Sequence, residues 1–357
     1  MKKVCISTYC EWSSYGSVMQ AIGLKKTLQG LNYESFIVRD APAPLGARDF
    51  PFCISKNPVT LLKNIINLFH RKHKRILYKN SVEFINKNVD IQYFNDYEVL
   101  KKHIPEADYY LAGSDQIWHP ALCKPAFFLD FVDEKKRLSY AASMGVTGVS
   151  EKNEDAFQKL VSQIDKISVR EKEMLPILQK YTDKPLNVHI DPTFLVDADE
   201  WRKLEKEYII KEPYILVYAI YWDEALNKKL KWLHKKSGYN IVGLCPGGFS
   251  KLWANQKIYD ADPAQFLYLI DHAEAVISSS FHGVAFSLIF NKRLVPVINP
   301  DSPSRINTLL ETLTVEKSTI AQVMDFDLSK YDKTNQLIEH EKRRSISYLK
   351  EILEYNE

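Results

Sequence analysis

The chain has 357 residues, of which 45% are hydrophobic and 26% are charged, as in an ordinary globular protein. Its length exceeds the size at which a single core keeps growing, so we expect more than one domain. The formal net charge of +3 does not indicate a nucleic acid partner. No apolar stretch approaches the roughly 18 residues of a membrane span, and the five cysteines form no CxxC pair. We therefore expect a cytoplasmic protein without structural disulfides.

The first half of the chain alternates strand and helix patterns. Strands are predicted at 3–8, 33–39, 108–112, 138–142, 166–169 and 187–190. Helices are predicted at 17–29, with Gly30 as the C-cap, and from about 152 to 164. Alternation of this kind predicts a parallel sheet covered by helices on both faces.

A long helical pattern from 57 to about 88 contains the basic run from His70 to Arg75. Such a run indicates a solvated basic face, or a peripheral contact with the anionic inner face of a membrane. The spacing of His70 and His73 could hold a metal ion, but the sequence supplies no neighbouring carboxylate or cysteine. We therefore predict no metal site.

The second half repeats the alternation. Strands are predicted at 214–220, 240–244, 275–278 and 294–298. Asp262 and Gln265 form a predicted capping box, with Pro263 at the first helical position. We predict an α/β protein with two Rossmann-like, doubly wound domains that face each other across a cleft. The predicted domains span 1–185 and 186–325, and a helical segment at 326–357 packs back on the first domain.

The segment 275–291 reads as a strand followed by Ser-Ser-Phe-His-Gly and an apolar helix. This pattern places His282 in the first turn of a helix at the carboxyl end of a strand. Free N–H groups and the helix dipole attract phosphate or carboxylate at such a turn, so the imidazole could act on an anionic substrate. Alternatively, Ser279 or Ser280 only caps the helix and His282 is a polar core residue.

Other polar clusters also follow predicted strands, and Asp115 and Arg170 stand out among them. Asp115, in a Gly-Ser-Asp turn, could deprotonate a hydroxyl or could only tie down its loop. Arg170 offers a planar fork to an anion, or pairs with its neighbour Glu171 at the surface. The sequence contains no GxGxxG, GxxxxGK[ST] or GxSxG motif, which disfavours nicotinamide, P-loop and α/β-hydrolase chemistry.

Several motifs together resemble the polysaccharide pyruvyl transferase family. They are YGSVMQAIGLKKTLQGLNYE, GSDQIW, SYAASMG, ISVRE, DPTFL and ISSSFHGVAFSLIFNKRLVPV, in this order along the chain. The resemblance implies a glycosyltransferase-B-like fold. It also implies transfer of the enolpyruvyl skeleton of phosphoenolpyruvate onto two hydroxyls of a sugar, which makes a pyruvate ketal and releases phosphate. The expected partners are phosphoenolpyruvate as co-substrate, with no further cofactor, and a cell-surface glycan or its lipid-linked precursor.

The resemblance also implies roles for individual residues. His282 matches the catalytic acid and Asp115 the base. The donor phosphoenolpyruvate is expected on the second domain and the acceptor on the first. Expected donor-binding residues are Arg170, Ser279, Ser280, Gly283, Lys292 and Arg305. Expected acceptor-binding residues are Ser14, Tyr15, Gly16, Ser114, Gln116 and Trp118.

One departure from the family pattern keeps other functions open. Some relatives carry an arginine where this chain has Ser280, so donor binding shifts to Lys292, Arg305 or Arg170, or the donor is a different one. The alternatives are a glycosyltransferase of the same fold that uses a nucleotide sugar, and a non-catalytic protein that binds a glycan or an anion. The acceptor sugar, the bridged hydroxyls and the oligomeric state are left open.

Overall fold

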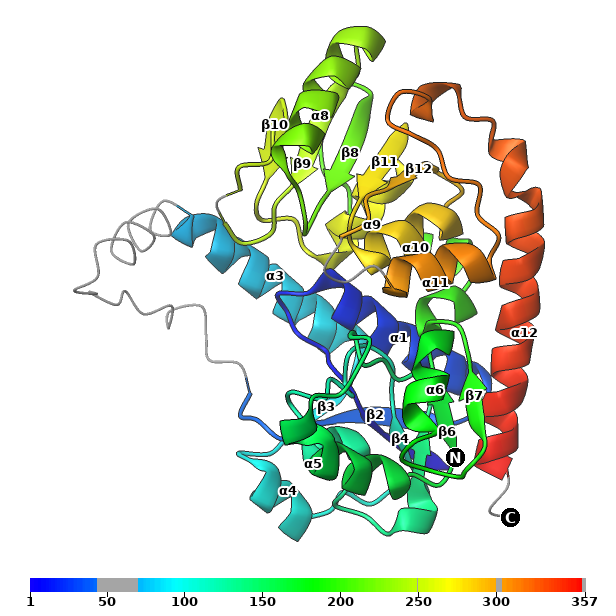
Figure 1. Cartoon of the computed structure of the whole chain (residues 1–357). Helices are drawn as coiled ribbons and strands as arrows, with labels where there is room; N and C mark the ends of the chain where they lie inside the picture. Colours follow the sequence, from blue (N-terminus) through cyan, green and yellow to red (C-terminus); the bar gives the residue numbers. More distant parts are fainter. Residues whose placement is uncertain (44–69, 249, 300–303, 355–357) are drawn as a thin grey trace.

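The first half of the chain folds around a parallel sheet. The computed structural model describes residues 1–43, 70–248, 250–299 and 304–354 (Figure 1). The sheet has the order β3-β2-β1-β4-β5. Its strands are β1 (Lys3–Ser7), β2 (Glu34–Arg39), β3 (Ile91–Tyr93), β4 (Tyr109–Ala112) and β5 (Arg137–Ser139). In register, Cys5 of β1 lies opposite Phe36 and Tyr110. Two further parallel strands, β6 (Ile167–Val169) and β7 (Leu186–Val188), continue it through isolated bridges that join Leu138 to Lys166 and Ala142 to Val169.

A second parallel sheet repeats this strand order. Its order is β10-β9-β8-β11-β12. The strands are β8 (Tyr214–Tyr218), β9 (Asn240–Leu244), β10 (Gln256–Ile258), β11 (Ala275–Ser278) and β12 (Arg293–Pro296). Both sheets start in the middle and wind outwards in two directions, which is the doubly wound arrangement of a Rossmann-like fold. The predicted α/β class with two Rossmann-like sheets is confirmed.

Helices pack on the faces of both sheets, and α1 and α3 lie between them (Figure 1). The α-helices are α1 (Tyr15–Gly30), α3 (Arg71–Asn88), α4 (Tyr97–Lys102), α5 (Glu151–Ser162), α6 (Leu175–Leu178), α7 (Ala198–Arg202), α8 (Glu224–Ser237), α9 (Pro263–Asp271), α10 (Phe281–Ile289), α11 (Ser304–Thr312) and α12 (Asp332–Glu354). Short 3₁₀ turns are η1 (Pro125–Phe128), η2 (Glu134–Lys136), η3 (Lys172–Met174), η4 (Pro192–Leu195), η5 (Val323–Asp325) and η6 (Leu328–Tyr331). Among the described residues, no helix combines the length and apolar character needed to cross a bilayer.

The ends of several elements differ from the predicted ones. The strands at 240–244 and 275–278 occur as predicted, whereas the short edge strands β3 and β10 were not predicted. Helix α1 starts two residues early because Ser14 is its N-cap and accepts a hydrogen bond from the Ser17 N–H (3.4 Å). Gly16 therefore belongs to a helix and not to a loop, and the C-cap is Leu31, one residue after the predicted Gly30. The predicted capping box of α9 is present, with a Gln265 N–H to Asp262 Oδ1 bond of 2.9 Å.

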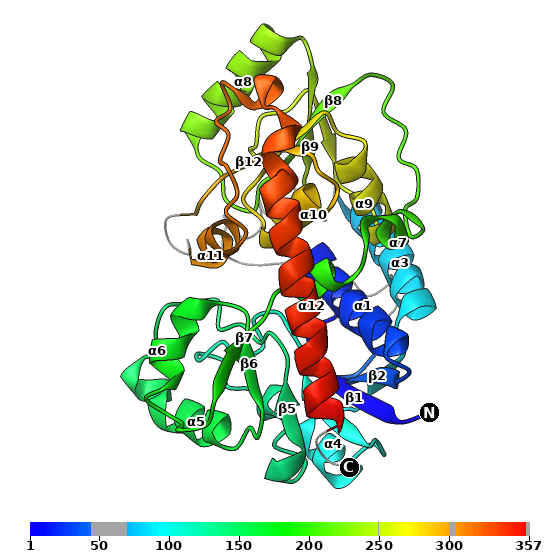
Figure 2. The same ribbon diagram turned by 90° about the vertical axis from the view of Figure 1, so that its right-hand side faces the viewer.

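The last helix, α12, runs along both sheets (Figure 2). Near its start, the Asn335 amide donates to Asn291 Oδ1 beside β12 (2.9 Å). Near its end, the Tyr348 hydroxyl donates to the carbonyl of Ser139 in β5 (3.2 Å). Between them, Arg344 donates to the carbonyl of Val188 in β7 (2.6 Å). This helix therefore ties the two sheets together, and the predicted boundaries at 185 and 325 stay predictions.

The basic run in α3 faces the second sheet more than the sequence suggests. The His73 Nδ1 atom lies 2.7 Å from Asp260 Oδ2, so the fold supplies the carboxylate that the local sequence lacks. Lys74 lines a cavity that is described below. His73 and Lys74 are thus half-buried against the second half of the chain, whereas Lys72 and Arg75 are exposed, as predicted for a solvated basic face. Residues 57–69 of the predicted long helix lie outside the described part of the chain.

Candidate active site between the two sheets

A cavity of about 450 Å³ lies between the carboxyl ends of the two sheets. We call it the His282 cavity. Segments that follow β1, β4, β8 and β11 line it, which is the edge where open α/β sheets bind ligands. Its lining includes Tyr9, Glu11, Ser14, Gly16, Ser17, Asp115, Gln116, His119, Tyr218, Ser279, Ser280, Phe281, His282 and Arg305. Of the predicted site residues, His282, Asp115, Gln116, Arg305, Ser14, Gly16, Ser279 and Ser280 therefore meet at one cavity.

His282 is the second residue of α10, and its surroundings leave the imidazole little freedom. Ser280 caps the helix by accepting a hydrogen bond from the Gly283 N–H (3.5 Å). A Cβ atom at Gly283 would lie 2.2 Å from Ser278 Oγ, so only glycine fits there. His282 is 6% exposed, and its Nε2 atom has no hydrogen-bond partner among the described residues. Capping by Ser280 and placement of the imidazole at the cavity, which the sequence offered as alternatives, therefore occur together.

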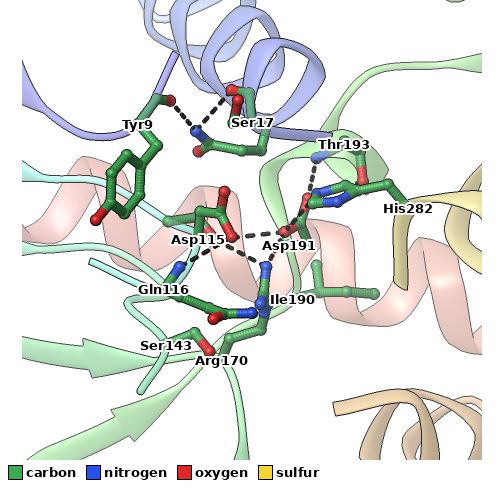
Figure 3. Close-up of polar contacts among 12 residues, drawn as sticks. Tyr9, Ser17, Asp115, Gln116, Ser143, Arg170, Ile190, Asp191, Thr193 and His282 are labelled. Atoms are coloured by element: carbon green, nitrogen blue, oxygen red, sulfur yellow. Dashed lines mark hydrogen bonds and ion pairs between the residues drawn. The ribbon is translucent and has the colours of Figure 1, made fainter. Parts of the chain in front are cut away.

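Asp191 faces His282 and was not among the predicted site residues (Figure 3). Its Oδ2 atom lies 3.6 Å from His282 Nε2 and accepts a hydrogen bond from Arg170 Nη1 (2.6 Å). The other oxygen, Oδ1, accepts from the N–H (3.0 Å) and the hydroxyl (2.8 Å) of Thr193. Burial alone would raise the pKa of Asp191, but His282 and Arg170 hold that pKa well below its usual value. The carboxylate is thus held in its charged form beside the imidazole.

A sequence signal for Asp191 existed in the DPTFL motif. An Asp-Pro pair after a predicted strand places a carboxylate at the same sheet edge as the other polar clusters. The local pattern equally suits a helix cap, and Asp191 does cap the 3₁₀ turn η4. The other partners of the Asp191 carboxylate, Arg170 and His282, are distant from it in the sequence, so the local pattern does not reveal them.

Arg170 is not among the residues that line the His282 cavity; it is buried beside Asp191 and is held from three sides. Its Nε atom donates to Glu171 Oε1 (3.0 Å), and its guanidinium carbon lies 4.2 Å from the ring centre of Phe281. The ion pair with Glu171 that the sequence allowed is therefore present, but buried and not at the surface. Burial lowers the pKa of Arg170, and Glu171 and Asp191 outweigh this effect and raise it. The Nη2 group has no partner among the described residues.

Arg305 brings a guanidinium to the His282 cavity. With the Gln116 amide oriented so that its oxygen faces this group, the oxygen accepts from Nη1 and from Nη2 (2.8 Å). The Arg305 Nε group is buried and has no partner among the described residues. Burial and the neighbouring Arg170 lower the pKa of Arg305. Two cations with unused N–H groups beside one imidazole form a site suited to an anion.

Asp115 lines the cavity in a constrained conformation. Its backbone has a φ of 70°, in the left-handed region that aspartate tolerates better than most residues. Its Oδ1 atom accepts a hydrogen bond from the Gln116 N–H (2.9 Å), so the side chain ties down its own loop. The residue also lines the cavity, so it can tie down its loop and face a ligand at the same time.

Other predicted ligand-binding residues serve the core. Tyr15 is 1% exposed, stacks on Phe266 at 4.7 Å and donates to the carbonyl of Ala261 (2.7 Å). Trp118 is fully buried and donates to the carbonyl of Phe127 (3.2 Å). These contacts correct the predicted acceptor roles of Tyr15 and Trp118. Ser114 is also fully buried, and its hydroxyl lies 3.3 Å from Asp191 Oδ2, behind the cavity.

Two predicted donor-binding residues have other roles. The Ser279 hydroxyl accepts from the Tyr221 N–H (2.8 Å) and donates to the Tyr221 carbonyl (3.0 Å), so it fixes the loop after β8. Lys292 donates to the carbonyl of Asp271 (2.6 Å) beyond the carboxyl end of α10. Helix α10 has 9 residues, so its two ends are separated by roughly 13 Å at 1.5 Å per residue. The structure thus removes Lys292 from the anion site and leaves Arg305 there.

Potential metal ligands gather away from the His282 cavity. Among the described residues, Glu205, Asp271 and His272 place one ligand atom each within 4.8 Å of one another. Arg202 already pairs with Asp271 through bonds of 2.8 and 3.2 Å. Burial and the nearby Asp271 raise the pKa of Glu205 to about 7. Arg202 therefore already supplies a positive charge beside these carboxylates.

Comparisons with solved structures agree on the fold. MnaA of S. aureus, in a structure with UDP, has 14% identity and a TM-score of 0.56, with 99% of this chain and 97% of that chain covered. The UDP-GlcNAc 2-epimerase of Methanocaldococcus jannaschii has 13% identity and a TM-score of 0.50, with 99% of both chains covered. An alpha-glucosyltransferase in complex with UDP has 10% identity and a TM-score of 0.50, with 98% and 96% covered. At such low identity the likeness shows the fold alone, which is glycosyltransferase-B-like.

Sequence comparison identifies the family. No curated protein sequence gave a match. The pattern of the family described as "Polysaccharide pyruvyl transferase" matches residues 15–302, from the start of α1 to the segment before α11. The match covers His282, Asp115, Arg170 and Asp191 and most of the chain, so the protein is a member of the polysaccharide pyruvyl transferase family.

Proposed function

We propose that the protein transfers the pyruvyl group of phosphoenolpyruvate onto a sugar of a cell-surface polysaccharide or its lipid-linked precursor. The observation that carries this proposal is the group of buried charges at the His282 cavity and directly behind it. Arg170 and Arg305 have unused N–H groups for the phosphate and carboxylate of the donor. The N-terminal end of α10, where His282 lies, adds the favourable end of a helix dipole.

The chemistry needs an acid, and His282 is placed to supply it. Protonation of the methylene carbon of the donor makes its methyl group and leaves an oxocarbenium-like carbon. With Nε2 facing Asp191, the other imidazole nitrogen is the one left for the substrate, and Asp191 stabilises the imidazolium. Near that nitrogen lies Gly16, where a Cβ atom would come within 2.0 Å of Nδ1. The glycine therefore leaves room for the ring.

The sugar supplies the two oxygen atoms of the ketal. One hydroxyl adds to the oxocarbenium-like carbon and loses its proton to Asp115. The second hydroxyl then replaces the phosphate on the same carbon, and its proton leaves with the phosphate. Arg170 and Arg305 stabilise the negative charge that grows on the departing phosphate.

The decisive experiment measures phosphate release from phosphoenolpyruvate. The acceptors are a panel of lipid-linked or aryl galactosides, mannosides and N-acetylhexosamines. We expect release that depends on one of these acceptors and that falls by about 10²–10⁴-fold in His282→Ala. The control is His340→Ala, at an exposed position of α12, which keeps the wild-type rate. Wild-type turnover by His282→Ala would remove the proposed acid.

A nucleotide-sugar-dependent glycosyltransferase is the second candidate. The likeness of fold to MnaA and the glucosyltransferase, both solved with UDP, favours testing it. A ligand stabilises the state that it binds, so UDP would raise the melting temperature and phosphoenolpyruvate would not. If phosphoenolpyruvate bound but no acceptor led to phosphate release, the protein would instead be a non-catalytic binding protein.

A further inference from the structure

A second and larger cavity opens beside the His282 cavity. It has a volume of about 780 Å³, and we call it the Trp222 cavity. Ser14, Tyr218 and Ile220 line both cavities, so the two are adjoining parts of one space. Phosphoenolpyruvate is a small molecule and the His282 cavity holds the groups that suit it. The Trp222 cavity is therefore free for the part of a larger ligand that does not react.

The walls of the Trp222 cavity suit a sugar. Trp12 follows β1 and Trp222 follows β8, so the two indoles reach the cavity from different sheets. Both are half-buried, and Trp12 packs edge-on against Tyr78, with ring centres 5.1 Å apart. Indole rings offer flat apolar faces to the C–H face of a pyranose, while Ser13, Ser14 and Ser250 offer hydroxyls.

Lys74 gives this cavity a positive charge. Among the described residues that line the Trp222 cavity, it is the one charged side chain. Its ammonium group makes no hydrogen bond or ion pair within the described part of the chain. The stem packs near Gly247, where a Cβ atom would meet Lys74 Cε at 3.7 Å. A half-buried cation in an otherwise uncharged lining favours an anionic group more strongly than a fully solvated lysine does.

We propose that the Trp222 cavity binds the non-reacting part of the acceptor, and that this part carries a phosphate group that pairs with Lys74. The acceptor is then a glycosyl phosphate or diphosphate, as in a lipid-linked precursor, and not a neutral glycan. The reacting sugar lies at His282, and the next sugar or the sugar–phosphate linkage lies between Trp12 and Trp222. This inference rests on the proposed function, because it takes the His282 cavity as the place of pyruvyl transfer.

A binding experiment tests the inference without any turnover. The probes are the 1-phosphates of galactose, glucose, mannose and N-acetylglucosamine, each compared with its methyl glycoside by calorimetric titration. We expect at least one 1-phosphate to bind about tenfold or more tightly than its methyl glycoside. Lys74→Gln should remove that difference, because it keeps the stem and removes the charge.

The matched control is Lys72→Gln, an exposed lysine two positions earlier near the start of the same helix. It should leave the difference between 1-phosphate and methyl glycoside unchanged. Trp222→Ala should weaken the 1-phosphate and the methyl glycoside of the binding sugar alike, because it removes the apolar wall and not the charge. The proposal would be overturned if the 1-phosphate and the methyl glycoside bound equally, or if none of the 1-phosphates bound. Equal effects of Lys72→Gln and Lys74→Gln would overturn it as well.

A further arm uses UDP as the probe. If UDP binds more tightly than every sugar 1-phosphate and Lys74→Gln weakens it, the cavity holds a nucleotide and the acceptor assignment is wrong. The two proposals fail in different ways. If pyruvyl transfer to methyl glycosides and to 1-phosphates occurred with equal kcat/KM, the anionic acceptor would be contradicted, while the pyruvyl transferase activity would stand. Binding of a 1-phosphate through Lys74 with no phosphate release from phosphoenolpyruvate, for any acceptor, contradicts the pyruvyl transferase activity.

Discussion

The carboxylate of Asp191 faces the imidazole of His282, with Oδ2 at 3.6 Å from Nε2, although the two residues follow different strands, β7 and β11. Arg170 holds the same carboxylate oxygen from its other side at 2.6 Å. A buried carboxylate in this position orients the ring and stabilises its protonated form. The group combines an imidazole with a cation, and Asp191 contacts both.

We expect Asp191→Asn to lower kcat by about 10²–10⁴-fold, because the substitution keeps the shape and removes the charge that supports the His282 imidazolium. In the double variant with His282→Ala, the further loss should be small, since both act through one ring. Phosphate release from phosphoenolpyruvate measures both. Breaking a buried pair costs about 3–5 kcal/mol of stability, so a melting curve must show that the variant is folded.

The control for Asp191→Asn is Asp197→Asn. Asp197 is an exposed carboxylate that pairs with Lys342 of α12. The Asp197→Asn variant should keep the wild-type turnover. If Asp191→Asn reduced stability but left kcat and its pH profile unchanged, Asp191 would have a structural role only.

Gly16→Ala should reduce activity by displacing the imidazole. The added Cβ would lie 2.0 Å from His282 Nδ1, and the ring or helix α1 must shift. In an ordinary helix the same change stabilises by about 1 kcal/mol. Gly30→Ala in the same helix is the control, because a Cβ there meets nothing within 4 Å. We expect lower kcat and lower stability for Gly16→Ala only, measured by phosphate release and thermal unfolding; equal behaviour of the two variants would contradict the close contact.

Arg305→Gln and Lys292→Gln should separate the two cations that follow the SSFHG helix. Arg305 lines the His282 cavity and has an unused Nε group, whereas Lys292 donates to the Asp271 carbonyl beyond the far end of α10. We expect Arg305→Gln to raise the KM for phosphoenolpyruvate about tenfold or more, since a charge-assisted bond to the donor is lost. Lys292→Gln should leave KM unchanged. A larger effect of Lys292→Gln on KM would place the donor elsewhere.

The buried His189 should make stability depend on pH. Burial, with a contribution from Arg344, lowers the pKa of His189 to about 3, and its ring stacks on Tyr348 at 4.3 Å. Between that value and the unfolded pKa of about 6.5, the unfolded chain binds the proton that the folded chain does not. This contribution to stability is complete above pH 6.5 and is lost as the pH falls, by up to about 1.4 kcal/mol per pH unit.

Denaturant unfolding at several pH values measures this effect. His189→Gln should have a shallower loss of stability between pH 6.5 and pH 3 than the wild type, even if it is less stable at neutral pH. His103→Gln, at an exposed position after α4, should keep the wild-type slope. Parallel curves for the wild type and His189→Gln would show that the ring is protonated as easily in the folded chain as in the unfolded one.

Much of the fold follows from local patterns. Runs such as 240–244 and 275–278 are strands because they are short, apolar and bounded by polar turns, and their alternation with helices leaves a parallel sheet as the consistent arrangement. The start of α1 was placed two residues late, because the cap depends on whether Ser14 or a later serine accepts the N–H bond. Edge strands β3 and β10 have three residues each, too few to show a period.

The placement of His282 at the carboxyl edge of the second sheet could also be predicted, since a strand followed by a capping serine and an apolar helix defines that position by itself. The roles of Tyr15, Trp118 and Asp191 could not be predicted from the sequence. A tyrosine or tryptophan beside a glycine-serine loop looks the same in sequence whether it packs in a core or lines a cavity. The structure buries both aromatic residues and brings Asp191 to the imidazole.

The sequence alone therefore establishes the class of fold, the family resemblance and the residue at the head of α10, because these depend on spacing within a few turns of chain. The pairing of Asp191 with Arg170 and His282, the separation of Arg305 from Lys292, and the position of Lys74 beside Trp222 depend on how the sheets face each other. Buried charges and cavities are set by contacts between segments far apart in the chain, and local periodicity contains no information about those distances.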